Sequence, residues 1–180
     1  RIVVTGGQIA HLEAGFARRI ERYWRREAQV IPPPVDVDFF TPGGERGGHL
    51  LIVAALVPYK MVETGVAVAR ELGLPLRIIG EGPMRRSLMR GAPDNVEFLG
   101  RVSRERLRDE YRSAGLLLVP NVEDFGMVTV ESLACGTPVV GLEASGTADV
   151  VISGEHGELA AVGSAKALAA ACTRVLGRSF

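Results

Sequence analysis

Two carboxylates stand eight positions apart in the segment EDFGMVTVE. Glu123 ends a loop that follows an apolar run, and Glu131 falls about one turn into the helix that comes next. A buried carboxylate needs hydrogen-bond donors, and the hydroxyls of a sugar or a ribose supply them. The other interpretation is a carboxylate that only complements the positive end of the helix dipole. The residues by themselves leave both open.

Lys60 comes immediately before a predicted helix, and the only other lysine of the chain is Lys166. An ammonium beside a free helix N-terminus would bind a phosphate or pyrophosphate; a surface lysine is the alternative. The Gly-Glu-Gly-Pro turn at 80–83 lets backbone approach a ligand closely. Because Arg85 stands where G-x-G-x-x-G requires its third glycine, the turn argues against a dinucleotide site.

Composition excludes several partners. The 180 residues carry 21 basic and 21 acidic side chains, so no global field attracts nucleic acid or anionic lipid. No apolar run reaches the length of a membrane span, which favours a cytoplasmic protein, at full length peripheral at most to the inner face of a membrane. We assign no metal and no disulfide, because the histidines and cysteines show no ligand or framework spacing: His11, His49, His156, Cys135 and Cys172.

The elements that must position these residues alternate along the chain. Helical periodicity over residues 8–28 and a Pro-rich crossing segment fill residues 1–48, and an α/β core follows over 49–180. Strands are expected at 50–56, 76–79, 96–99, 116–119 and 138–142, and helices at 61–72, 83–89, 103–112, 127–135 and 165–176. Ser103 is the expected N-cap of one helix and Gly136 the left-handed stop of another. Continuous apolar strands between helices predict one α/β domain, a doubly wound, Rossmann-like parallel sheet with its ligand beyond the carboxyl ends of the strands.

Several segments together resemble one family. EDFGMVTVESLACGTPVVG resembles the E-x7-E signature of the C-terminal, donor-binding domain of retaining GT-B glycosyltransferases of the family-four, group-one type. The segments VIPPPVDVDFFTP, VPYK, LRIIGEGP, NVEFLGRVS and SGTADVVISGEHGEL resemble further parts of that domain, in the family's order. The set extends over about residues 16 to 176. Since Arg1 begins within an apolar, strand-like run, we expect the chain to be a piece of a longer protein.

The resemblance implies a role for each matching position. Lys60 would contact the donor's diphosphate and neutralise the leaving group without a metal. Glu131 would accept hydrogen bonds from ribose hydroxyls, and Glu123 would be the catalytic residue near the donor sugar. The remaining implied donor-binding residues are Gly80 and Gly82 in the glycine turn, Gly100, Arg101 and Val102, whose backbone would hold the nucleotide base, and Phe125, Gly126 and Met127 at the helix N-terminus.

The same resemblance implies the reaction. One half of a GT-B enzyme would bind a nucleotide-sugar as substrate, with no separate cofactor, and a hexose would pass with retention to a glycan or lipid-linked acceptor in polysaccharide biosynthesis. The VPYK form favours a mannosyltransferase that uses GDP-mannose, with a UDP-sugar as the other candidate. Because the partner domain, the N-terminal acceptor domain, is absent from this chain, we expect the chain alone to be inactive.

Ala55 departs from the family pattern, which usually has an arginine there. Losing one charge-assisted contact to a diphosphate removes about one to two decades of affinity, unless another arginine substitutes. Arg85, Arg86 and Arg101 are the candidates. The departure keeps two alternatives open: a degenerate nucleotide-binding or scaffolding GT-B domain without transferase activity, and a different GT-B enzyme such as an epimerase or phosphorylase.

Overall fold

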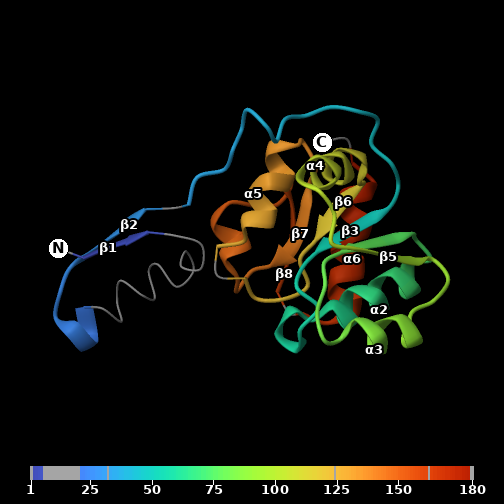
Figure 1. Cartoon of the computed structure of the whole chain (residues 1–180), viewed down its shortest axis with the longest axis horizontal. Coiled ribbons are helices and arrows are strands. Elements are labelled where there is room, and N and C mark those ends of the chain that lie inside the picture. The colour runs from blue at the N-terminus through green and yellow to red at the C-terminus, as the bar shows by residue number, and fades with distance from the viewer. Residues whose placement is uncertain (1, 6–20, 32, 124, 162, 179–180) are drawn as a thin grey trace.

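The computed structural model of the chain describes residues 2–5, 21–31, 33–123, 125–161 and 163–178. Its main element is a six-stranded sheet with all neighbouring strands parallel, in the order β5-β4-β3-β6-β7-β8 (Figure 1). The strands are β3 (Leu50–Val53), β4 (Leu76–Ile79), β5 (Val96–Gly100), β6 (Leu116–Leu118), β7 (Val139–Leu142) and β8 (Gly157–Ala160). The order places β3 at the centre, with later strands added outward on both sides.

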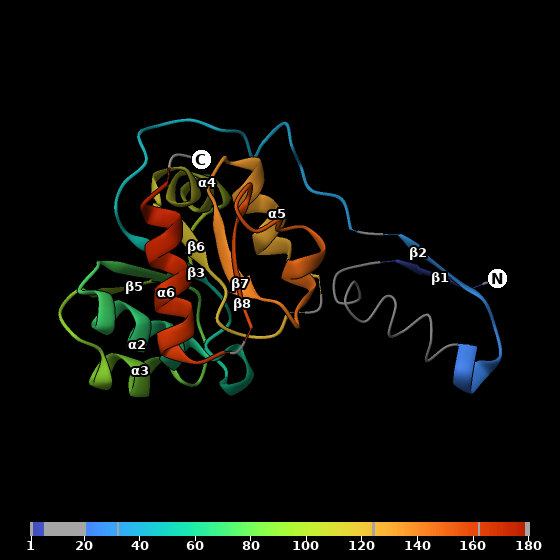
Figure 2. The same cartoon turned by 180° about the vertical axis from the view of Figure 1, so that it is seen from behind.

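Helices cover both faces of this sheet, as continuous apolar strands require. One core joins Leu50, Ile52 and Leu118 to α2 (Val62–Leu72), α3 (Arg85–Gly91) and α6 (Ala165–Leu176), which lie together in Figure 2. The other joins Leu51 and Leu117 to α4 (Arg104–Ser113) and α5 (Met127–Ala134). The doubly wound, Rossmann-like α/β fold expected from the sequence is confirmed.

The expected elements are present with small shifts at their ends. Ser103 caps α4 by accepting a hydrogen bond from the Arg106 amide at 3.2 Å, and Gly136 follows α5 with φ 78°. The expected strand at 50–56 ends earlier, at Val53, although backbone hydrogen bonds from Ala54 and Leu56 still reach the next loop. The structure adds three elements that the sequence pattern did not predict: β8 and the short 3-10 turns η1 (Pro58–Lys60) and η2 (Gly146–Asp149).

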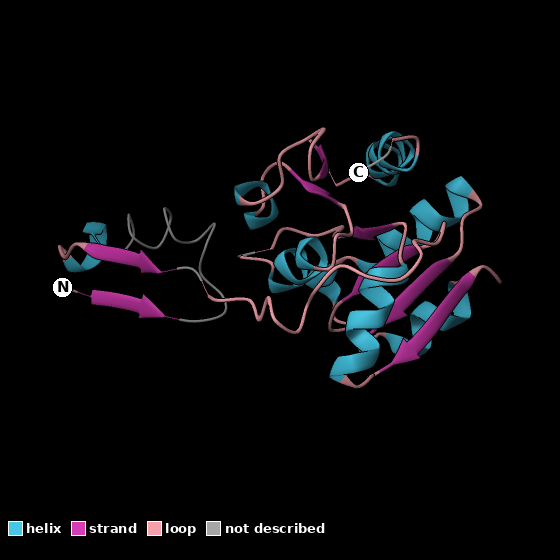
Figure 3. Ribbon diagram, turned by 90° about the horizontal axis from the view of Figure 1, so that it is seen from above, coloured by secondary structure: helices cyan, strands magenta, loops and turns pink. Residues whose placement is uncertain are grey.

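The first part of the chain forms a separate parallel pair. Strands β1 (Ile2–Thr5) and β2 (Ala28–Ile31) pair only with each other among the described residues, and Figure 3 shows them apart from the main sheet. The helix expected over 8–28 is wrong at its end, because only residues 21–24 of the described part are helical and β2 follows; Arg25, with φ 50°, interrupts the helical backbone. The rest of that expectation lies outside the described residues.

Two strand-end loops are fixed against each other. The amides of Ala54 and Leu56 donate to the carbonyls of Ile79 and Glu81, and Gly80 has φ +134°. A Cβ at Gly80 would come within 1.9 Å of the Ala54 carbonyl oxygen, and one at Gly82 within 2.4 Å of the Leu56 oxygen. The glycines of this turn are therefore required by contact between two loops, a closer constraint than the approach of a ligand.

Replacing Gly80 by alanine is expected to destabilise the domain by about 2 kcal/mol or more, because the strained φ and the backbone clash add. The matched control is Gly48→Ala, where no atom lies within 4 Å of the added Cβ; its change should stay within about 0.5 kcal/mol. Urea unfolding compares the two. Equal midpoints would contradict the proposed loop contact.

Candidate functional site

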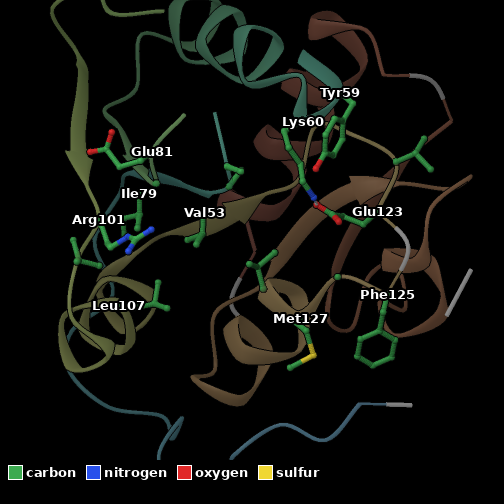
Figure 4. A pocket seen from close by; sticks show the side chains of 17 residues that line it. Val53, Tyr59, Lys60, Ile79, Glu81, Arg101, Leu107, Glu123, Phe125 and Met127 are labelled. Atoms are coloured by element: carbon green, nitrogen blue, oxygen red, sulfur yellow. Dashed lines mark hydrogen bonds and ion pairs between the residues drawn. The ribbon is translucent and has the colours of Figure 1, made fainter. Parts of the chain in front are cut away.

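A pocket of about 710 Å³ opens beyond the carboxyl ends of the central strands (Figure 4). Loops after β3, β4, β5 and β6 and the start of α5 form its walls. The residues lining it are Val53, Ala54, Ala55, Tyr59, Lys60, Ile79, Gly80, Glu81, Arg101, Val102, Leu107, Val122, Glu123, Phe125, Gly126, Met127 and Val128. This edge of a doubly wound sheet is where ligands bind in such folds.

The shape of the pocket follows from the strand order. Strands β3 and β6 are neighbours, yet the chain leaves β3 toward α2 on one face and leaves β6 toward α5 on the other. The connections therefore part at this point of the sheet and leave a crevice between them. The loop after β3 carries Lys60 and the loop after β6 carries Glu123.

Lys60 and Glu123 meet across this crevice. The Lys60 Nζ lies 2.6 Å from Glu123 Oε1, and both side chains are mostly buried, with 19% and 14% exposed. Figure 4 shows the ammonium against the carboxylate. The buried amide of Asn121 donates to the same oxygen at 3.1 Å. Two donors thus fix Glu123 through one oxygen, and Oε2 accepts no hydrogen bond from the described residues.

Backbone contacts hold the Glu123 loop against the next strand-end loop. The Glu123 amide donates to Ser145 Oγ at 2.8 Å, and its carbonyl accepts from the Gly146 amide at 2.8 Å. Gly126, with φ 78°, then turns the chain into α5, so that the residues carrying the first amides of the helix line the pocket. These amides have no partners within the helix and carry the positive end of its dipole. The first turn of α5 contains no acidic residue to neutralise it.

Glu131 lies one turn deeper along α5 and does not line the pocket. Its Oε2 accepts a hydrogen bond from the Tyr111 hydroxyl on α4 at 2.9 Å. Burial raises the pKa of the half-buried Glu131 carboxyl, while the Tyr111 hydrogen bond and the Arg104 charge act in the opposite direction. The carboxylate expected to need a partner thus has one donor from the protein.

The structure brings most of the sequence-predicted residues to one pocket. Lys60, Gly80, Arg101, Val102, Glu123, Phe125, Gly126 and Met127 line it; Gly82, Gly100 and Glu131 do not. Gly100 adjoins it, because a Cβ there would lie 2.7 Å from Glu81 Oε1. Phe125 lines the pocket and is 7% exposed.

Of the three arginines considered as substitutes at the Ala55 position, Arg101 is the one that lines the pocket, and its guanidinium points inward in Figure 4. Arg85 lies 3.6 Å from Glu81, and Arg86 borders a different hollow with Met89 and Arg90. Sequence reasoning missed Tyr59, Asn121, Tyr111 and Ser145. Tyr59 lies beside Lys60 and Asn121 lies two positions before Glu123, so the local sequence placed them near the site without showing their contacts. No spacing signals Tyr111 and Ser145, because they contact residues 20 and 22 positions away.

Other site types find little support in the described residues. No group of three or more His, Cys, Asp and Glu in that part of the chain is arranged as metal ligands. Both cysteines are buried, which raises the pKa of Cys135 to about 11 and that of Cys172 to about 12. No helix within the described residues is long and apolar enough to cross a membrane.

Comparison with known proteins identifies relatives. The sequence profile described as "Glycosyl transferases group 1" matches residues 42–178. The chain is 33% identical to the D-inositol 3-phosphate glycosyltransferase of Mycolicibacterium smegmatis over 75% of this chain and 36% of that protein. It is 32% identical to the protein of the same name from Geodermatophilus obscurus, over 99% of this chain and 47% of that protein.

Among solved structures, sucrose-phosphate synthase from Thermosynechococcus elongatus superposes with a TM-score of 0.80 at 28% identity, over 97% of this chain and 48% of that one. The chain therefore spans less than half the length of each of these three proteins.

Glu131→Gln is expected to raise the thermal midpoint at pH 7. The raised pKa means that the native state binds the Glu131 proton more tightly than the unfolded chain does, so the charged carboxylate lowers stability at neutral pH. Glutamine removes the charge and keeps an oxygen for Tyr111. The increase in the thermal midpoint should vanish as the pH falls below 4.5, the ordinary pKa of a glutamate carboxyl, because the carboxyl is then protonated in both the native and the unfolded state.

Calorimetry at pH 7 and pH 4 measures both parts of this prediction, with Glu71→Gln as an exposed control that should change little. A lower midpoint for Glu131→Gln at pH 7 would show that the charge stabilises the fold.

Proposed function

The chain belongs to the group 1 glycosyl transferases, and we propose that it is the donor-binding half of a GT-B enzyme that transfers a hexose from a nucleotide-sugar with retention of configuration. The observation that carries this proposal is the convergence of Lys60, Arg101 and the N-terminus of α5 on one pocket. Their charges and dipole fit a diphosphate, the leaving group of such a transfer.

Lys60 can bind the diphosphate and keep its ion pair with Glu123 at the same time. An ammonium has three donors, so Nζ can keep its contact with Glu123 Oε1 and still donate to a phosphate oxygen. Arg101 supplies the second cation that the Ala55 position lacks. The negative charge that develops on the leaving oxygen thus meets two cations and the amides of α5, which supports transfer without a metal.

The two glutamates act at different parts of the donor. Glu123, fixed through Oε1, keeps Oε2 for the donor sugar and is the catalytic residue. Glu131 accepts hydrogen bonds from the ribose hydroxyls. The backbone at Gly100, Arg101 and Val102 holds the base, while the amides of Phe125, Gly126 and Met127 bind sugar hydroxyls or phosphate.

The preferred donor is GDP-mannose, with UDP-sugars as the alternative. The acceptor is a glycan or a lipid-linked molecule, and the name of the relatives from Mycolicibacterium smegmatis and Geodermatophilus obscurus adds a phosphorylated inositol to the candidates. The acceptor side belongs to an N-terminal domain, the partner of this one in a cytoplasmic enzyme, so the chain alone binds donor and transfers nothing. The rival function is a scaffolding domain that has lost its donor, which Ala55 at the pocket wall favours.

Lys60→Ala is expected to weaken binding of a nucleoside diphosphate by about tenfold to a hundredfold, because one charge-assisted contact is lost. Isothermal titration measures this loss. Lys166→Ala is the matched control, since Lys166 is exposed on α6 away from the lining residues. Equal dissociation constants for the two variants would remove Lys60 from the site.

Thermal-shift titration with GDP, UDP, ADP and their sugars identifies the donor base. A ligand at about a hundred times its dissociation constant adds about 2.7 kcal/mol, which is a shift of several degrees for a domain of this size. We expect the largest shift with GDP and GDP-mannose. A larger shift with UDP would reassign the donor, and no shift with any of these ligands would favour the scaffolding function.

A further inference from the structure

Tyr111 and Glu131 join the two helices that cover one face of the sheet. Tyr111 lies on α4 and is fully buried, and its hydroxyl donates to Glu131 Oε2 on α5 at 2.9 Å. Within the described residues, Oε2 accepts no other hydrogen bond and Oε1 accepts none. One carboxylate oxygen is thus held by the protein, and the other has no hydrogen-bond partner among the described residues.

Tyr111 is itself immobilised at both ends. Its ring packs edge-on against Phe40, with centroids 6.0 Å apart, and its carbonyl accepts a hydrogen bond from the Thr137 hydroxyl at 2.6 Å. A close-packed side chain of this kind has no alternative rotamer of similar energy. The position of its hydroxyl is therefore set by the fold, and it restricts Glu131 in turn.

The contact also favours the charged form of Glu131. The Tyr111 hydrogen bond and the Arg104 guanidinium lower the pKa of Glu131, against the burial that raises it. The Cys135 thiol, which interacts electrostatically with both Glu131 and Tyr111, stays neutral because burial raises its pKa to about 11. Burial and Glu131 raise the pKa of Tyr111 well above its ordinary value, so the phenol stays a donor.

We propose that Tyr111 is a positioning residue that orients the Glu131 carboxylate so that its free oxygen accepts hydrogen bonds from the ribose of a ribonucleoside diphosphate. The inference rests on the proposed function, and specifically on ribose as the ligand of Glu131. Because a ribose hydroxyl is the partner, Tyr111 contributes to selection of a ribonucleotide over its deoxy analogue. A site built to bind a hydroxyl rejects an analogue that lacks it, since its polar groups are then left unpaired.

The test replaces Tyr111 by phenylalanine, which keeps the ring and its packing and removes only the hydroxyl. Dissociation constants are measured by titration of the 180-residue chain with the best-bound nucleoside diphosphate and with its 2′,3′-dideoxy form. Tyr111→Phe is expected to lose about tenfold in affinity for the ribonucleotide and nothing for the dideoxy form. The wild type should distinguish the two ligands and the variant should distinguish them poorly.

Thr137→Val is the matched control, because it removes another buried hydroxyl that contacts Tyr111 and leaves the Tyr111 hydroxyl in place. A loss of ribose discrimination as large in Thr137→Val as in Tyr111→Phe would overturn the proposal in favour of general loosening. Glu131→Asp is the reference variant: it keeps the charge and displaces the ribose-binding carboxylate itself, so it sets the largest loss of ribose discrimination that a misplaced carboxylate can cause.

The pH dependence of ribonucleotide binding separates a positioning role of Tyr111 from a role in packing alone. Without the phenol hydrogen bond the pKa of Glu131 rises further, so binding of the ribonucleotide by Tyr111→Phe should fail at a higher pH than in the wild type as the solution is acidified. Carbon-13 NMR titration of the Glu131 carboxyl in the free chain should show the same upward shift. The proposal would be overturned if Tyr111→Phe distinguished the ribonucleotide from its dideoxy form as well as the wild type does and lost binding at the same acidic pH.

The two proposals can fail separately. If the wild type discriminates against the dideoxy ligand and Glu131→Gln abolishes this while Tyr111→Phe does not, the role of Glu131 stands and that of Tyr111 falls. If the wild type binds no nucleoside diphosphate, both fall.

Discussion

The point where β3 and β6 lie side by side governs the rest of this structure. The chain leaves these neighbouring strands toward opposite faces of the sheet, so the two connections part and a crevice remains between them. Lys60 and Glu123 come from the two loops at this crevice and meet at 2.6 Å, although 63 positions separate them in sequence. The pocket is thus a consequence of strand order, and its polar groups are those that the two loops present.

Glu123 in the pocket and Glu131 beside it lose hydration on burial, and each accepts a hydrogen bond from the protein on one oxygen. Glu123 is mostly buried and has a cation and an amide on one oxygen. Glu131 is half-buried and has a phenol on one oxygen. A buried group that is only partly satisfied by the protein weakens the fold, and in the proposed function the donor would supply the missing hydrogen bonds to these oxygens. Stability and binding therefore make opposite demands on these carboxylates.

The crossing segment is joined to the same region of the core. Phe40 packs on Tyr111 in the core beneath α4 and α5, Arg104 lies 4.1 Å over the ring of Phe39, and Arg112 donates to the Thr41 carbonyl at 2.7 Å. The segment that precedes the sheet thus ends on the helix that carries Tyr111. The packing that anchors this segment and the packing that orients Glu131 share one aromatic contact.

The sequence by itself determined the elements whose pattern is local. Apolar runs separated by helical periodicity gave the strands and helices of the core, Ser103 and Gly136 marked helix ends, and the doubly wound class followed from their alternation. It missed β8, because Gly157 and Glu158 interrupt any apolar run, and it placed the end of the first helix wrongly.

Only the tertiary structure decided which distant residues meet. Lys60 with Glu123, Tyr111 with Glu131, and Arg101 rather than Arg85 or Arg86 at the pocket all depend on which strands are neighbours and where their loops turn. Local periodicity carries no information on that pairing, since it fixes the face of an element and leaves its neighbours open.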